Sequence, residues 1–330
     1  LFRSDRSLSG VVQAQGTLGG SINAPLIQGS ASVRGGRFDD AGTGLSLRAL
    51  TLDAAFDRNL ATVSQFSATD GGKGLITGDG RIDLRNGGAS TFTLALKRFR
   101  LIDNDLAEAQ ASGPITVTRA TSGQFKLAGD LRIDRAEVAP NPPTPSGVVT
   151  IEVQEINAPP GRQQYQVQAR GTPILLDVTL KAPSQVFIQG RGLDVEMSLD
   201  AHVGGSTRAP VLTGAARVVR GDFQFAGKRF EFDDTGTVSL STKPEQIRLN
   251  LRAVRDDPTL TAVILVKGTA AKPEITLSSV PALPQDEVLS QVLFGRSASQ
   301  LSAIEAAQLA SSVASLSGGG GFDVLGNLRE

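Results

Sequence analysis

Residues 174–180 read Ile-Leu-Leu-Asp-Val-Thr-Leu, and every second residue of this stretch is apolar. Ile174, Leu176, Val178 and Leu180 share one parity, whereas the positions between them hold a leucine, an aspartate and a threonine. Successive side chains of a strand point to opposite faces, so this pattern predicts a strand with one apolar and one largely polar face. The same period recurs from near the N-terminus to about residue 280. The sequence therefore predicts one long, repetitive all-β structure that is apolar on one side.

The apolar residues of the clearest alternating runs are the candidate lining of that face. They are Phe92, Leu94, Leu96, Ile174, Leu176, Val178, Leu180, Val195, Met197, Leu199, Phe223, Phe225, Phe230, Phe232, Val238, Leu240, Ile247, Leu249, Leu251, Val263, Leu265, Ile275 and Leu277. Two structures fit the pattern. The sheet could fold onto a second sheet around a filled core, or it could curl and leave an open hydrophobic groove. The pattern does not separate them, but length and repetition favour the extended, curled sheet.

An internal repeat supports a repetitive sheet. Residues 19–38 (GGSINAPLIQGSASVRGGRF) and 204–223 (GGSTRAPVLTGAARVVRGDF) are identical at ten of twenty positions, and a partial third copy keeps the spacing from Gly268 to Pro273. The Gly-to-Pro segment predicts a turn, because Gly supplies unusual backbone angles and Pro restricts the entry to the next strand. Gly36 and Gly221 are interpreted as the next reversal. Such strand–turn–strand units give roughly twenty short strands, stacked over about 90–100 Å.

Three segments depart from the simple pattern. The prolines between 140 and 160 predict a loop or edge excursion, because Pro cannot donate to a central ladder. The apolar parity switches near Lys97 and Arg98, which predicts a bulge or turn there. After Pro284 the spacing becomes helical. We therefore expect an elongated sheet groove over residues 1–283 and a C-terminal helical segment over 284–330.

The C-terminal segment predicts two short helices. In the first, Val288, Leu289, Val292 and Leu293 share one face, and Gly295 is a plausible C-cap. The second follows Ser302, whose spacing to Glu305 fits a capping box. Its apolar stripe is formed by Leu301, Ile304, Leu309, Val313 and Leu316. The glycines at 318–321 predict a flexible break.

The composition favours no catalytic chemistry. The chain has no Cys, one His and one Tyr, and 33 basic residues balance 33 acidic ones. Most acid–base and nucleophilic schemes therefore lack parts, and no Cys/His cluster has the spacing of a metal site. His202 beside a turn is expected to be a surface residue. We therefore expect that the protein is not an enzyme and has no cofactor, metal or nucleic-acid partner. The sequence contains no run of 18 apolar residues that would predict a membrane span.

A long apolar groove has a natural cargo in lipid acyl chains. Moving a 16-carbon chain from a bilayer into water costs about 0.8 kcal/mol per CH₂, or about 13 kcal/mol in total. A groove lined by Ile, Leu, Val and Phe would lower that barrier without any catalytic residue. The second possibility is a scaffold whose open strand edges template partner strands by β-augmentation.

The C-terminal third resembles the TamB family. The resemblance rests on the unit at 204–223, on FAGKRFEFDDTGTVSL (225–240), on VKGTAAKPEITLSS (266–279) and most specifically on residues 281–319, which include Leu-Phe-Gly-Arg at 293–296. It covers about residues 200–330, and the rest is similar only in its style of repeat. It is also similar to the wider AsmA-like, bridge-type lipid-transfer group.

The resemblance implies a taco-shaped β-sheet with a hydrophobic interior in the periplasm of a Gram-negative bacterium. It implies phospholipid movement to the outer membrane and help in assembling outer-membrane β-barrels and in protein secretion, within a translocation and assembly module. The implied partners are phospholipid acyl chains and an Omp85-type, TamA-like outer-membrane protein. We expect this chain to be an internal to C-terminal fragment. Membrane contact would then be made by parts that are missing here, including the family's inner-membrane anchor.

Overall fold

The structure is a computed structural model, and it is dominated by β-strands. It describes residues 6–21, 24–85, 87–139, 172–190, 192–225 and 227–317. The strands are β1 (Arg6–Ser21), β2 (Ala24–Asp40), β3 (Leu45–Arg58), β4 (Leu60–Thr69), β5 (Leu75–Asp83), β6 (Ser90–Asp103), β7 (Ala107–Arg119), β8 (Phe125–Val138), β9 (Leu175–Gly190), β10 (Leu193–Ser206), β11 (Ala209–Phe225), β12 (Lys228–Phe232), β13 (Thr237–Ser241), β14 (Arg248–Asp256), β15 (Thr261–Gly268) and β16 (Pro273–Val280).

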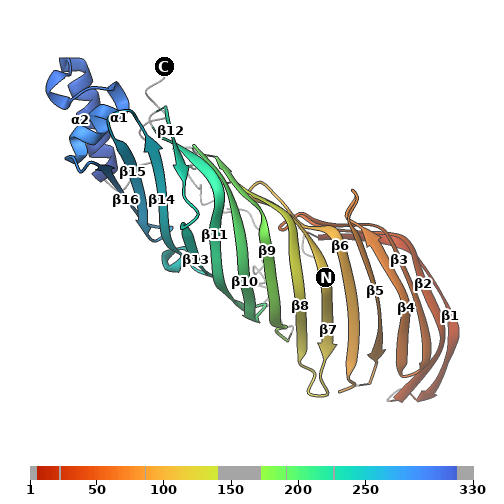
Figure 1. The fold of residues 1–330 in the computed structure, drawn as a ribbon. Helices are drawn as coiled ribbons and strands as arrows, with labels where there is room; N and C mark the ends of the chain where they lie inside the picture. Colours follow the sequence, from red (N-terminus) through yellow and green to blue (C-terminus); the bar gives the residue numbers. More distant parts are fainter. Residues whose placement is uncertain are drawn as a thin grey trace, which may run out of the picture.

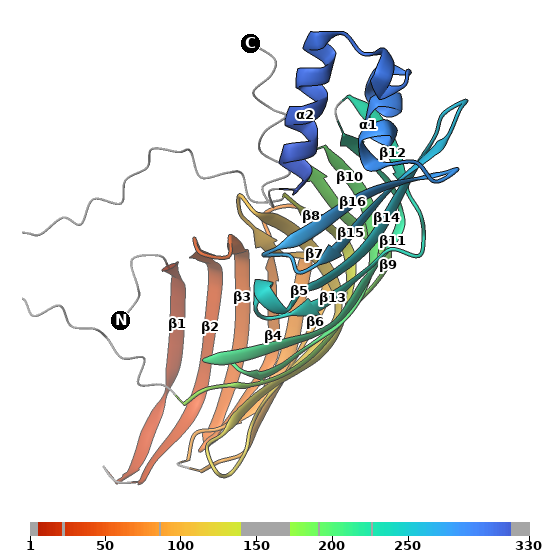
Figure 2. The ribbon, with the colours of Figure 1, turned by 90° about the vertical axis from the view of Figure 1, so that its left-hand side faces the viewer.

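All sixteen strands belong to one curled sheet, and their order follows the chain (Figures 1 and 2). Neighbours pair antiparallel except β8 and β9, which run parallel. The short β13 pairs with both β11 and β14. The predicted fold class is therefore confirmed: a long, curled, mixed sheet followed by two short helices.

Two α-helices and two short 3₁₀ helices complete the described chain. They are η1 (Pro244–Gln246), α1 (Gln285–Phe294), η2 (Ala298–Gln300) and α2 (Ala303–Ser317). Gly295 ends α1 in the left-handed conformation, and its N–H donates to the Gln291 carbonyl at 2.9 Å, as the predicted C-cap requires. The capping box of α2 is also present, because the Ser302 N–H donates to Glu305 Oε2 at 2.8 Å and the Glu305 N–H to Ser302 Oγ at 3.4 Å.

The repeated Gly-to-Pro segment forms hairpins, as predicted. Gly20 pairs with Pro25, Gly205 with Pro210 and Gly268 with Pro273, each pair next to the turn that joins two consecutive strands. All three glycines have a positive φ, between 74° and 87°, which L-residues rarely adopt. The third, partial copy therefore has the same local structure as the two longer copies.

The reversal predicted at Gly36 and Gly221 is wrong. Both glycines lie inside long strands, β2 and β11. A Cβ on Gly221 would collide with the Asp194 carbonyl oxygen and would come within 2.6 Å of the Val195 Cα. This glycine permits a close approach of β10 and β11 within the sheet, and the chain reverses only after Phe225.

The parity switch at Lys97 and Arg98 is a β-bulge, as predicted. The register of β6 against β7 shifts between Leu96 and Phe99, and Arg98 has a φ of 45°. The Arg98 N–H donates to Ser112 Oγ at 2.8 Å instead of to the ladder. The bulge returns both Leu96 and Phe99 to the same buried cluster, so the apolar face continues across it.

The described strands are longer than the sequence suggested. The described residues hold sixteen, several of them of 14 to 17 residues. The alternating runs at 148–153 and 165–169, the proline-rich segment and the glycines at 318–321 lie outside the described residues. Fifteen strands along the hydrogen-bonded path span roughly 70 Å at about 4.8 Å per step.

A cluster of buried apolar residues at the C-terminal end of the sheet, which includes Phe225, Phe230, Val288 and Leu289, gives a test of the fold. Phe230 is completely buried (0% exposed), whereas Ile304 is 74% exposed. Phe230→Ala should lower the free energy of unfolding by about 3–5 kcal/mol, because it removes a packed ring and leaves a cavity. Ile304→Ala, the control, should change it by less than about 0.5 kcal/mol. Urea denaturation followed by circular dichroism measures both. Equal effects would contradict the packing described here.

Candidate functional site

The apolar residues of neighbouring strands lie in register and form rows across the sheet. Phe92 pairs with Val117, Val117 with Leu127, and Leu127 with Leu176. A second row joins Leu180, Ala201, Gly214 and Leu240. Directly paired residues of a sheet share a face, so the rows make one continuous apolar surface. We call this surface the apolar face and the opposite side of the sheet the polar face.

Burial follows the same alternation. Phe99 is 1% exposed and Ala111 0%, while many residues between such positions are exposed. No second sheet covers the apolar face anywhere in the described part of the chain. These low exposures therefore come from the curl of the sheet and from packing between neighbouring side chains. Toward β1 the cover fades: Val12 is 68% exposed and Leu18 is 76% exposed.

Glycines let large side chains lie flat on this face. On β5, Gly78 pairs with Leu94 and Gly80 with Phe92. A Cβ on Gly80 would come within 2.6 Å of the Phe92 ring, so only a bare backbone leaves space for it. Phe66 of β4 meets Phe92 edge-on, with 5.9 Å between the ring centroids. This arrangement lets the rings of Phe66 and Phe92 meet across β5.

Most of the predicted lining residues lie on the apolar face. Two clusters of packed apolar side chains, one over β3–β14 and one at the C-terminal end, contain sixteen of them: Leu94, Leu96, Val178, Leu180, Val195, Met197, Leu199, Phe223, Phe225, Phe230, Phe232, Val238, Leu249, Leu251, Ile275 and Leu277. Phe92 and Leu176 are on the same face by register. Leu240 is also aligned with this face through Gly214. Ile174 and Ile247 are half-buried and lie just before β9 and β14 rather than inside them.

Val263 and Leu265 point to the other side of the sheet. Their neighbours Ala262, Ile264 and Val266 are the residues of β15 that join the C-terminal cluster. Residues 263–266 are all apolar, so alternation could not identify the inward parity. In the sequence, only the apolar side of the helix that follows, α1, indicates that β15 is covered more fully than the other strands.

The helix α1 covers the C-terminal end of the apolar face. Val288 and Leu289 are 0% exposed and pack in one cluster with Phe225 and Phe230. The predicted stripe of α2 is only partly correct, because Leu309 is buried but Ile304 is exposed. The side chains of the last turns, with Val313 and Leu316, lie outside the described ones. The apolar face is thus closed beneath α1 and open along the rest of the described sheet.

The polar face is held by cross-strand ion pairs. Lys126 Nζ lies 2.6 Å from Asp177, and Arg220 Nε lies 2.6 Å from Glu196. The Arg220 hydrogen bond lowers the pKa of Glu196 despite the opposing effect of burial. His202 is half-exposed, 3.7 Å from Asp177, as expected for a surface residue. These charges make the polar face a poor partner for another apolar layer.

Groups that could support other chemistry are scarce. Across the described ranges, no three His, Cys, Asp or Glu side chains cluster closely enough to hold a metal ion. The helices in that part of the chain are too short or too polar to cross a membrane. What remains as the candidate site is the apolar face itself. The fold defines an elongated, single-layer β-groove protein.

Comparison with known proteins identifies the family. The family model described as the TamB C-terminal domain matches residues 64–330, so the chain belongs to the TamB family. The match begins at residue 64, whereas the resemblance read from the sequence is specific only from about residue 200 onward. A "Translocation and assembly module subunit TamB" from Haemophilus influenzae is 24% identical over 311 residues, which cover 90% of this chain and 24% of that protein. The chain therefore spans about a quarter of the length of this curated relative.

Acid should weaken one end of the sheet. At the end of β5, the Arg85 guanidinium and backbone N–H hydrogen-bond Asp83 and lower its pKa from 3.8 to about 2. Because the folded-state pKa lies below the unfolded one, this contribution is present above about pH 4 and is lost as the pH falls toward 2. Asp83→Asn should thus lower the thermal unfolding midpoint at pH 6, and by a smaller amount at pH 2.5. An effect independent of pH would contradict this role.

Proposed function

We propose that the apolar face carries phospholipid acyl chains, so that the chain is part of a hydrophobic conduit between the two membranes of a Gram-negative envelope. The observation that supports this most directly is the continuity of the face. Apolar rows cross the parallel β8–β9 pairing and the β6 bulge without interruption. In this proposal residues 1–283 supply the conduit and residues 284–330 its C-terminal segment.

Energetics favour such a cargo. The free energy of a 16-carbon acyl chain is about 13 kcal/mol higher in water than in a bilayer. Contact with an apolar surface lowers this free energy at each step. No specific contact is needed, so a chain can slide along rows of Leu, Ile, Val and Phe. The predicted lining residues that lie on the apolar face are the proposed contacts.

Family membership supports a place in a translocation and assembly module, the role named for the Haemophilus influenzae relative. We propose that the whole protein works in the periplasm and is anchored in the inner membrane. We also propose that it meets an Omp85-type, TamA-like partner at the outer membrane. Outer-membrane biogenesis and protein secretion would then depend on this chain.

A charge placed on the apolar face should block lipid binding. Leu249 is half-buried on this face, and the next residue on β14, Asn250, is exposed on the polar face. Leu249→Arg should weaken binding of a fluorescent phospholipid by about tenfold or more, because a guanidinium is poorly tolerated among acyl chains. Asn250→Arg adds the same charge one residue away and should leave binding nearly unchanged. Leu176→Arg should act like Leu249→Arg.

Fluorescence titration of the purified chain measures these affinities, and circular dichroism shows whether each variant keeps its sheet. If the folded Leu249→Arg and Leu176→Arg variants bound the phospholipid as well as the parent chain does, the conduit proposal would fail.

A second candidate function is β-augmentation. β1 is an edge strand of 16 residues, paired only with β2 among the described strands, and its side chains are almost all exposed. Such an edge can template a partner strand through main-chain hydrogen bonds. A proline on β1, at an N–H that points away from β2, should abolish partner pairing and spare phospholipid binding. The Leu249→Arg variant should do the reverse.

A further inference from the structure

A polar pocket of about 660 Å³ lies where the strand β3 begins and the strand β6 ends. The hairpin between these two strands is short: β4 ends at Thr69 and β5 begins at Leu75, whereas β6 continues to Asp103. The turn between β2 and β3 reaches across this gap, and the Asp103 N–H donates to the Thr43 carbonyl at 2.9 Å. The pocket is thus lined by the start of β3, the end of β6, the turn between β2 and β3 and the turn between β4 and β5. We call it the rim pocket.

The rim pocket is lined by residues of both faces of the sheet. Asp40 pairs with Leu45, and Leu45 packs against the cluster of the apolar face. The neighbouring pair, Asp39 and Ser46, belongs to the opposite parity and therefore to the polar face. All four residues line the pocket. A molecule with its apolar part on the apolar face could therefore place a polar end here.

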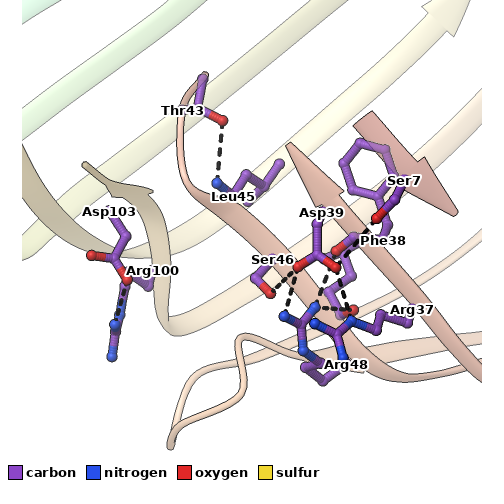
Figure 3. Close-up of polar contacts among 11 residues, drawn as sticks. Ser7, Arg37, Phe38, Asp39, Thr43, Leu45, Ser46, Arg48, Arg100 and Asp103 are labelled. Atoms are coloured by element: carbon purple, nitrogen blue, oxygen red, sulfur yellow. Dashed lines mark hydrogen bonds and ion pairs between the residues drawn. The ribbon is translucent and has the colours of Figure 1, made fainter. Parts of the chain in front are cut away.

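Gly44 lets the turn between β2 and β3 lie close to the end of β6. It adopts a φ of +74°, and a Cβ at this position would collide with the Asp103 carbonyl. Any other residue would strain the turn and push it away from β6. Figure 3 draws the Arg100–Asp103 pair and the contacts around Asp39 with the Thr43–Leu45 segment between them. The Arg100–Asp103 pair belongs to β6 and Asp39 to β2, and the turn between β2 and β3 contacts β6 through the Thr43 carbonyl.

Most of the carboxylates in the pocket already accept hydrogen bonds from other residues of the protein. Asp39 accepts from Arg37 at 2.8 Å and from Ser46 at 3.0 Å, and Arg48 lies 2.6 Å from it, which together hold its pKa well below the usual range. Asp70 accepts three backbone N–H groups, including that of Arg100 at 3.0 Å. These two carboxylates stabilise the wall of the pocket.

Other groups keep free hydrogen-bonding capacity. Arg6 uses Nε for Asp40 at 3.0 Å, and its terminal nitrogens bond to no described residue. Arg100 binds Asp103 Oδ2 through Nη1 at 2.7 Å, and its buried Nε faces Glu108 at 3.5 Å, which leaves Nη2 without a hydrogen bond to the described chain. Asp103 is about half-exposed, and its Oδ1 accepts no hydrogen bond from the described chain. The pocket therefore offers unused donors beside an unused acceptor.

We propose that the rim pocket binds the headgroup of a zwitterionic phospholipid, with its phosphate on Arg100 and Arg6 and its ammonium on Asp103. Three arginines and four aspartates line the pocket, so it lacks the excess of positive charge that an anionic headgroup would favour. Leu45 joins the pocket to the apolar face and would guide the acyl chains there. This inference rests on the proposed lipid conduit and adds a headgroup preference to it.

Soluble short-chain lipids test the proposal. Isothermal titration calorimetry would compare dihexanoyl phosphatidylethanolamine, dihexanoyl phosphatidylglycerol and O-phosphoethanolamine, which has no acyl chains. The ethanolamine lipid should bind most tightly, and Arg100→Gln should weaken it by about tenfold, the loss of one charge-assisted contact. Arg34→Gln removes an equal charge from an exposed ion pair with Asp53 on the polar face and should change affinity by less than about twofold.

Gly44→Ala changes no charge but opens the turn, and should reduce the preference for the ethanolamine lipid. Binding of the uncharged dye N-phenyl-1-naphthylamine reports the apolar face separately and should survive both Arg100→Gln and Gly44→Ala. Equal binding of the two lipids, or no effect of Arg100→Gln with dye binding intact, would overturn the headgroup site and leave the conduit standing. O-phosphoethanolamine binding as tightly as the lipid would also overturn it. If the parent chain bound neither the dye nor the lipids, the conduit proposal itself would be refuted.

Discussion

One constraint governs this molecule: a single-layer sheet with an apolar face must keep that face from water. Most sheets do so by packing against a second layer. Here the described strands provide no such layer, and cross-strand ion pairs such as Lys126–Asp177 make the polar face a poor substitute. The remaining solutions are curling, a local cover and a ligand. The structure shows the first two directly, and the proposed function is the third.

Curl and cover act on different parts of the face. Between β4 and β10 the curl and close side-chain packing bury residues such as Phe99 and Ala111. At the C-terminal end α1 adds Val288 and Leu289 to the cluster and covers part of the surface. In the proposed conduit, an acyl chain on the open part of the face would therefore meet the part that α1 covers.

Much of the fold could be predicted because it depends on local backbone chemistry. The Gly268-to-Pro273 turn, the bulge at Arg98 and the capping box at Ser302 each follow from a few adjacent residues. The errors came from interactions between strands. The sequence alone predicts a turn at Gly221, because only the paired backbone of β10 shows why a side chain is excluded. The inward parity of β15 depends on α1, which the alternation of the strand cannot show.

The central claim is that the apolar face is occupied by lipid rather than closed against itself. Native mass spectrometry of the chain, purified from bacterial envelopes without delipidation, tests this most directly. The account predicts peaks heavier than the bare chain by the mass of one or more phospholipids, and their loss on mild activation. A spectrum that contains only the bare chain, from protein whose sheet is intact by circular dichroism, would contradict it.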